Sequence, residues 1–305
     1  MQDMLACFYC SRRYPRSAAS CARCKKPLPR SVQGRFYFQH ALAANPETIT
    51  YRAMDESEHA PRLIRVLRAT ATQSGKMRLE TEARIQQSLT GTDLCPEFIT
   101  AAEFNAFRTF CTVATFVEGI TFSDVVRRAT PSRIMDLFLL VLDSVERFQR
   151  ENLVICNLDS NHIRLTNEGE MRLVDLRCAR KPGALSHGLG KNGSKAPEQF
   201  ADNEPVSKGT DVFALGSILY TALTRRAPYA RWWSSVPDFS QPLVPASKRN
   251  RLVTPGLDTL ITKALEIEPM RRFSDVAAMR DAFWREFAGR TQVIVQPKRS
   301  WFAAL

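Results

Sequence analysis

Four cysteines near the start of the chain have the spacing of a metal site. Cys7 and Cys10 form one CxxC pair, Cys21 and Cys24 form a second, and ten residues separate the two pairs. Each CxxC turn presents two thiolates on one side of a tight knuckle, and zinc prefers four thiolates in a tetrahedron. The spacing predicts a structural zinc site with no open position for a substrate. Because so small a fold has little core, the metal should supply most of its stability.

A second group of reactive residue types lies in the middle of the chain, in VICNLDSNHIRLTNEGEMRLVDLRCAR, residues 154–180. Two short strands are expected, at residues 163–165 and 171–174, around a turn that contains Asn167 and Gly169. Asp175 follows the second strand directly. An acid at the end of a strand indicates a functional site.

This layout resembles the catalytic loop and metal-binding segment of the eukaryotic-type protein kinases, whose motifs are HRDLxxxxN and DFG. The matching letters here are ICNLDSNH and DLR. The resemblance puts Asn157 at the position of the catalytic base and His162 at the metal-ligand asparagine, and it keeps Asp175 as the metal-ligand aspartate. Asp159 falls where Ser/Thr kinases usually carry a phosphate-facing lysine, and it is the candidate surrogate base.

The segment that should cover the phosphates of ATP lacks the glycines of the family. Residues 41–55 fit its place, and Ala43, Asn45 and Thr48 stand where glycines are expected. Side chains there oppose the close approach of the backbone to phosphate. His162 also suits Zn²⁺ or Mn²⁺ better than the oxygen shell of Mg²⁺. We therefore expect weak binding of ATP and of Mg²⁺ or Mn²⁺.

The resemblance also assigns a cation and its partner acid. Arg65, in an apolar strand at residues 63–67, takes the place of the family's phosphate-binding lysine, and arginine keeps the charge but not the shape. Its partner in the helix expected at residues 76–89 is Glu82, with Glu80 as the alternative. Arg65 and Glu82 contribute either to cofactor binding or only to a structural ion pair.

The second half of the chain keeps the family's structural residues in order. Apolar residues recur at helical spacing between residues 134 and 148, which predicts a core helix. Residues 196–198 read APE, and the resemblance implies an ion pair between Glu198 and Arg272. It also implies that Asp211 opens the buried central helix.

Together these features predict an α+β protein with a bilobal protein kinase-like fold preceded by a small zinc ribbon. We expect the ribbon at residues 1–30, a linker at 31–36, an N-lobe at 37–115, a C-lobe at 116–290 and a basic tail at 291–305. No run approaches the roughly 20 apolar residues of a membrane helix, and the N-terminus has no signal-peptide core. The other four cysteines are scattered in apolar surroundings, which favours a reducing, cytoplasmic location.

The positive charge is concentrated near the N-terminus. The chain has a net charge of +12, and residues 1–35 hold eight Lys/Arg against one acid. Such a basic head fits a nucleic acid, an acidic protein or an anionic membrane surface. Phe8, Tyr9 and Tyr14 lie among its cysteines and permit base stacking, although aromatic residues in zinc knuckles also commonly serve for packing alone.

The retained residues maintain a fold, whereas the replaced ones handle ATP. This pattern favours a pseudokinase, a signalling protein that acts as a scaffold or allosteric regulator and uses the zinc ribbon to dock a protein partner. The first alternative is a divergent ATP-dependent Ser/Thr protein kinase with an unorthodox active site. The second is nucleic-acid binding through the basic ribbon.

Overall fold

The computed structural model describes residues 4–104, 109–185, 190, 193–201, 203–229 and 237–287. The chain divides into two compact units, Met1–Val117 and Glu118–Leu305, and both mix strands with helices, as the sequence predicts for a bilobal α+β protein. The basic tail expected at residues 291–305 lies outside the described residues. In the described part of the chain, no helix has the length and apolar character to cross a membrane.

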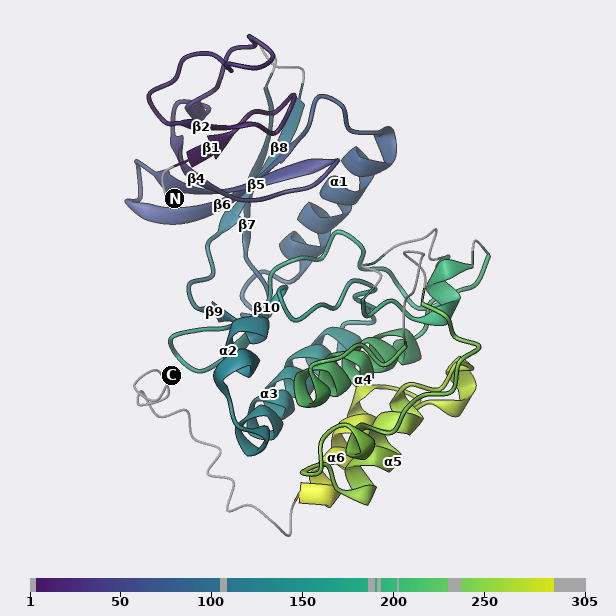
Figure 1. Ribbon diagram of the computed structural model, residues 1–305. Coiled ribbons are helices and arrows are strands. Elements are labelled where there is room, and N and C mark those ends of the chain that lie inside the picture. Colours follow the sequence, from purple (N-terminus) through teal and green to yellow (C-terminus); the bar gives the residue numbers. More distant parts are fainter. Residues whose placement is uncertain are drawn as a thin grey trace. The chain divides into compact units, whose positions relative to one another are not determined.

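The first unit is built on a six-stranded antiparallel sheet, in the order β3-β4-β5-β6-β8-β7. The strands are β3 (Ser31–Val32), β4 (Phe36–Ala44), β5 (Thr48–Asp55), β6 (Ala60–Leu67), β7 (Phe98–Phe104) and β8 (Thr109–Thr115). Helix α1 (Gln73–Ser88) contacts β6, β7 and β8 (Figure 1). It begins where the Thr72 side chain accepts a hydrogen bond from the Gly75 N–H.

The cysteine head, residues 4–30, packs onto this sheet. Its two strands, β1 (Met4–Ala6) and β2 (Arg13–Pro15), form an antiparallel pair. Strand β1 also contacts β4 (Figure 1). The Phe8 ring lies edge-on to Phe38 and Tyr51, with centroid distances of 6.0 and 5.9 Å. The Tyr51 hydroxyl donates a hydrogen bond to the Ala6 carbonyl at 2.5 Å. The head and the sheet therefore share one hydrophobic core.

The structure differs from the sequence prediction at the linker expected at residues 31–36. Ser31 and Val32 form β3, which pairs with Tyr37 and Phe36 of β4. The turn between them places Gln33 and Gly34 at φ values of 54° and 66°, a conformation that glycine adopts without strain. Strand pairing thus joins the head to the sheet, where a linker was expected to separate two cores.

The second unit is mainly helical and carries a small antiparallel sheet in the order β11-β10-β9. Its elements are β9 (Ile120–Thr121), α2 (Phe122–Arg128), α3 (Pro131–Arg150), β10 (Ile163–Leu165), β11 (Met171–Leu173), η2 (Pro197–Phe200), α4 (Lys208–Thr224), η3 (Ala246–Lys248), α5 (Pro255–Ala264), η4 (Pro269–Arg271) and α6 (Val276–Phe287). Here η denotes a short 3₁₀ turn.

Helices α3 and α4 form the centre of this unit. The Thr130 side chain caps α3, and Pro131 stands in its first turn, where no intrahelical N–H bond is lost. The apolar face of α3 packs against α4 and α6 (Figure 1). Helix α4 is buried along nearly its whole length, as the sequence predicts for a central helix. These helices support the loop at residues 154–162.

Candidate functional site

The four thiols of the cysteine head converge on one point. Sγ of Cys7 lies 3.5 Å from Sγ of Cys24, Sγ of Cys10 lies 3.6 Å from Sγ of Cys21, and all four sulfurs lie within 4.8 Å of one another. Four ligands placed about 2.3 Å from a tetrahedral ion are themselves about 3.8 Å apart. The N–H groups of Cys24 and Arg23 lower the pKa of Cys21 to about 6, which favours its thiolate. The cluster can therefore hold a metal ion.

Two of the three aromatic residues of the head are buried. Phe8 and Tyr14 are 2% and 6% exposed, because both lie in the core shared with the sheet. The partly buried Tyr9 ring has the Lys26 ammonium 5.6 Å from its centroid. Phe8 and Tyr14 therefore serve for packing and are not accessible for base stacking, whereas Tyr9 is only partly buried. What the head exposes is positive charge, from Arg12, Arg13, Arg16, Arg23, Lys25, Lys26 and Arg30.

The turn at the expected phosphate-covering position is closed by side chains. Asn45 Oδ1 accepts hydrogen bonds from the N–H groups of Glu47 and Thr48, at 2.9 and 2.8 Å. The Glu47 carboxylate forms an ion pair with Arg78 of α1, and Arg68 donates to the Asn45 carbonyl at 3.2 Å. The β4–β5 turn is thus tied both to itself and to α1. Its backbone N–H groups at Glu47 and Thr48 are already used by Asn45.

Arg65 on β6 and Glu82 on α1 form a buried ion pair. Arg65 Nη1 lies 2.6 Å from Glu82 Oε2, and the two side chains are 7% and 1% exposed. The side chain of the alternative partner Glu80 is 43% exposed and instead faces Lys76 at 3.9 Å. The structure therefore selects Glu82 of the two candidate acids.

Asp211 of α4 holds the loop that carries Asn157 by accepting hydrogen bonds from its backbone. The Asp211 carboxylate is fully buried and accepts hydrogen bonds from the Ile155 N–H at 2.9 Å and the Cys156 N–H at 3.1 Å. Burial raises the pKa of Asp211 to about 7. Cys156 has φ = 59°, so these bonds hold a backbone conformation that is unfavourable for a non-glycine residue. Asp211 fixes the loop.

Asn157 and His162 contact each other within this loop. His162 Nδ1 lies 3.1 Å from the Asn157 carbonyl oxygen and 3.4 Å from its Nδ2. His162 Nε2 lies 3.5 Å from Asp175 Oδ2. The structure thus brings together the three residues that the sequence assigns to the base and metal-ligand positions, and the residue at the base position is a neutral amide.

Asp175 is bound by its neighbour two residues along the chain. Arg177 Nη2 lies 2.6 Å from Asp175 Oδ2, and Arg177 Nε lies 3.0 Å from Oδ1. The Arg177 backbone N–H donates to the same Oδ1 at 3.2 Å. Asp175 is 4% exposed, so this bidentate pair lies largely out of water.

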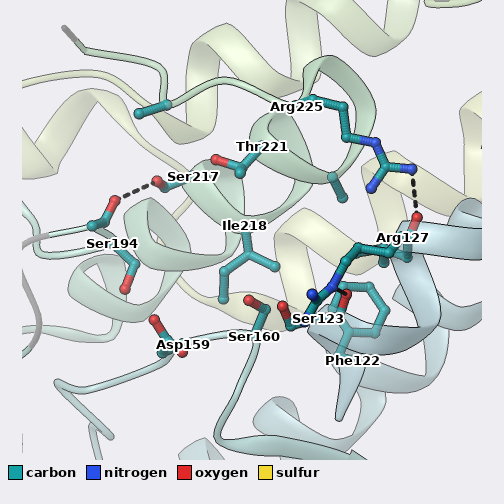
Figure 2. A pocket seen from close by; sticks show the side chains of 14 residues that line it. Phe122, Ser123, Arg127, Asp159, Ser160, Ser194, Ser217, Ile218, Thr221 and Arg225 are labelled. Atoms are coloured by element: carbon teal, nitrogen blue, oxygen red, sulfur yellow. Dashed lines mark hydrogen bonds between the residues drawn. The ribbon is translucent and has the colours of Figure 1, made fainter.

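Asp159 closes its own turn and lines a cavity. Its Oδ1 accepts hydrogen bonds from the Asn161 N–H at 2.8 Å and from the Asn161 side-chain amide at 2.7 Å. The adjacent cavity, drawn in Figure 2, has a volume of about 390 Å³. Its lining combines hydroxyl groups with apolar side chains, among them Ser160, Ser194, Ser217, Thr221, Phe122 and Ile218. Its size falls within the roughly 300–1,000 Å³ of ligand pockets.

Glu198 and Arg272 form a second buried pair. Arg272 Nη1 and Nη2 each donate to one oxygen of Glu198, both at 2.8 Å. The Arg272 side chain is 0% exposed and the Glu198 side chain is 4% exposed. The Thr210 hydroxyl at the start of α4 adds a hydrogen bond to Glu198 at 2.9 Å. The pair ties η2 to the segment after η4 and to α4.

Two contributors to the site were not identified from the sequence. Arg177 is the last residue of the DLR motif and stands where the family motif has glycine. A cation two residues after a metal-ligand acid could have indicated an ion pair with that acid. Asn161 closes the turn on Asp159, and Asx-type turns of this kind leave only a weak trace in sequence.

Comparison with known proteins gives a consistent family. The protein kinase domain family matches residues 48–284. The chain is 25% identical over 272 residues to a probable serine/threonine-protein kinase of Streptomyces coelicolor, covering 83% of this chain and 40% of that protein. It is 24% identical over 277 residues to serine/threonine-protein kinase PknB of Mycobacterium leprae, covering 86% and 44%. The chain thus spans less than half the length of these relatives.

Proposed function

We propose that this chain, which belongs to the protein kinase domain family, is a pseudokinase that scaffolds or regulates other proteins without transferring phosphate. The observation that carries the proposal is the residue at the base position. Asn157 is a buried amide in contact with His162, and a neutral amide does not accept the proton of a substrate hydroxyl as a carboxylate does. The surrogate carboxylate Asp159 is already engaged by Asn161.

The first unit supports the same proposal. Phosphoryl transfer depends on a tight grip on the phosphates, for which the family uses a glycine-rich loop and a lysine. Here Asn45 occupies backbone N–H groups of the corresponding turn, and the Glu47–Arg78 ion pair fixes that turn to α1. Arg65 is held by Glu82 in a buried pair, which fits a structural role. We therefore propose weak ATP binding.

The alternative, a divergent Ser/Thr protein kinase, is favoured by the names of the relatives, which describe serine/threonine-protein kinases. In this alternative Asp159 is the base, which requires its turn with Asn161 to open. The test is incubation with radiolabelled ATP and generic acceptor proteins, in Mg²⁺ and in Mn²⁺. We expect the wild type to label no more than Asp175→Ala. Robust labelling that Asp175→Ala abolishes would overturn the pseudokinase proposal, and its loss in Asp159→Asn would identify the base.

We also propose that the metal of the cysteine head is zinc and that its role is structural. Four thiolates form the ligand set that zinc takes in closed structural sites. The sulfurs are buried or half-buried, and the head shares its core with the sheet. The head then serves as a rigid docking surface for a protein partner. We propose the reducing cytoplasm as the compartment, because the metal site needs four free thiols.

Nucleic-acid binding by the head is the second alternative, and its support is the exposed positive charge. Because Phe8 and Tyr14 are buried, such binding would rely on phosphate contacts and on the partly buried Tyr9 ring. Affinity that depends on released counterions falls steeply with salt. Titration of the full chain with single-stranded and duplex DNA and RNA at two salt concentrations tests this. Binding that survives at physiological salt with a steep salt slope would favour the alternative over protein docking.

A further inference from the structure

Arg177 and His162 surround the Asp175 carboxylate. A carboxylate offers about four lone-pair sites, two on each oxygen. Oδ1 receives the Arg177 backbone N–H at 3.2 Å and the Arg177 Nε at 3.0 Å. Oδ2 receives the Arg177 Nη2 at 2.6 Å and faces His162 Nε2 at 3.5 Å. Three N–H donors of Arg177 therefore occupy this carboxylate, and the imidazole of His162 faces the remaining side of Oδ2.

The divalent cation that the protein kinase family implies does not fit this loop. Mg²⁺ takes oxygen ligands in near-octahedral geometry, whereas the groups around Asp175 are a guanidinium and an imidazole. To ligate Asp175, the ion would have to displace the guanidinium and remain beside it, so two cations would face each other in a poorly solvated site. At the same time, the guanidinium already neutralises the buried carboxylate, which removes the electrostatic reason to recruit a metal.

We propose that Arg177 is the resident cation of this loop and that it excludes divalent metal from Asp175. The inference goes beyond the proposed function, because a chain that transfers no phosphate can still bind a metal ion. It also stands independently of the reaction, since it rests on the contacts of one carboxylate. Arg177 thus keeps divalent metal ions away by binding Asp175, the carboxylate that the family uses as a metal ligand.

The test is Mn²⁺ binding to the full chain, with zinc in its cysteine head and without nucleotide, followed by the electron paramagnetic resonance signal of free Mn²⁺. The variants are Arg177→Ala, Asp175→Asn and the double variant. Arg172→Ala is the matched control, because Arg172 also pairs with an acid two residues away, the exposed Glu170. Arg177 does not have a positive φ, so alanine fits the backbone there.

We expect wild type, Asp175→Asn and Arg172→Ala to give the same Mn²⁺ isotherm. Arg177→Ala should bind one additional Mn²⁺ at Asp175. Its affinity for that ion should be about 10 to 100-fold higher than the affinity of the wild type at the same carboxylate, the range by which groups around metal ligands change affinity. That binding should vanish in the double variant, and Mn²⁺ should raise the melting temperature of Arg177→Ala alone. A folded Arg177→Ala without the additional site would overturn the role of Arg177.

If Arg177→Ala does not fold, the comparison of wild type with Asp175→Asn still decides the question. Wild-type Mn²⁺ binding that Asp175→Asn removes would show that the carboxylate accepts a metal despite Arg177, and would overturn the proposal. Identical wild-type and Asp175→Asn isotherms support it. Because nucleotide is absent and no phosphate transfer is measured, neither outcome depends on whether the chain is a pseudokinase.

Discussion

Changing Glu198 to alanine should destabilise the second unit by about 3 to 5 kcal/mol, the cost of removing one partner of a buried ion pair. Arg272 uses all five of its N–H donors: two go to Glu198, and the others go to the carbonyls of Glu266, Gly209 and Ile267 at 2.7, 3.0 and 2.9 Å. In Glu198→Ala two donors of a buried guanidinium lose their acceptors. At about 1 to 3 kcal/mol for each unsatisfied buried group, the same magnitude results.

The assay is thermal unfolding followed by tryptophan fluorescence. The sequence of the second unit holds all four tryptophans, and Trp284 on α6 is the one among the described residues, so its emission reports on that unit. For a unit of this size, each kcal/mol lowers the melting temperature by about 2 to 4 °C. Glu198→Ala should therefore melt about 6 to 20 °C below the wild type. Glu198→Gln, which keeps an acceptor oxygen but not the charge, should lose less.

A double-mutant cycle with Arg272→Met isolates the pair from its surroundings. The double variant removes both charges together, so its loss of stability should be smaller than the sum of the single losses by about 0.5 to 3 kcal/mol. An unchanged melting temperature in Glu198→Ala would refute the reasoning. Strictly additive losses would show that the 2.8 Å contacts do not couple the two side chains.

Three further outcomes are expected. Cys7→Ser combined with Cys24→Ser should abolish stoichiometric zinc in metal analysis and lower the melting temperature of the first unit by circular dichroism; retained zinc would place the metal elsewhere. Because the pKa of Asp211 rises from 3.8 to about 7 in the folded state, the stability difference between wild type and Asp211→Asn in urea unfolding should fall as pH rises through that window, by up to about 1.4 kcal/mol per pH unit; a flat difference would contradict the raised pKa. Reversion of the active-site positions should restore phosphotransfer from radiolabelled ATP to acceptor proteins only when Arg177→Gly is included. The other reversions are Arg65→Lys, Asn157→Asp, Asp159→Lys and His162→Asn. Activity without Arg177→Gly would count against the exclusion of metal by Arg177.

Much of the second unit could be predicted from sequence, because periodicity and motif order determine it. Apolar spacing indicates α3, and the Thr130–Pro131 start is a readable cap. The partners Glu198 and Arg272 lie far apart in the chain, but each belongs to a recognisable motif in a fixed order. In such cases a local pattern carries the long-range information.

The remaining features depend on where side chains point after the backbone has folded. Phe8 reads equally as an exposed knuckle residue or a core residue until β4 and β5 provide its contacts. The linker at residues 31–36 contained a turn signal at Gly34, but only pairing with Phe36 makes Val32 a strand residue. Likewise, the letters DLR do not reveal that Arg177 turns back onto Asp175. Sequence gives these residue types without their directions.

The shared core of the head and the sheet affects how this protein can be divided for study. The family match begins at residue 48, which is the first residue of β5. A fragment cut there would lose β4 and the head, and would expose Tyr51 together with an unpaired edge of β5. Open edges and bare aromatic surface promote aggregation. The boundary of the family match is therefore not a boundary of folding, and a fragment that stays in solution needs to begin no later than Met4, the first residue of β1.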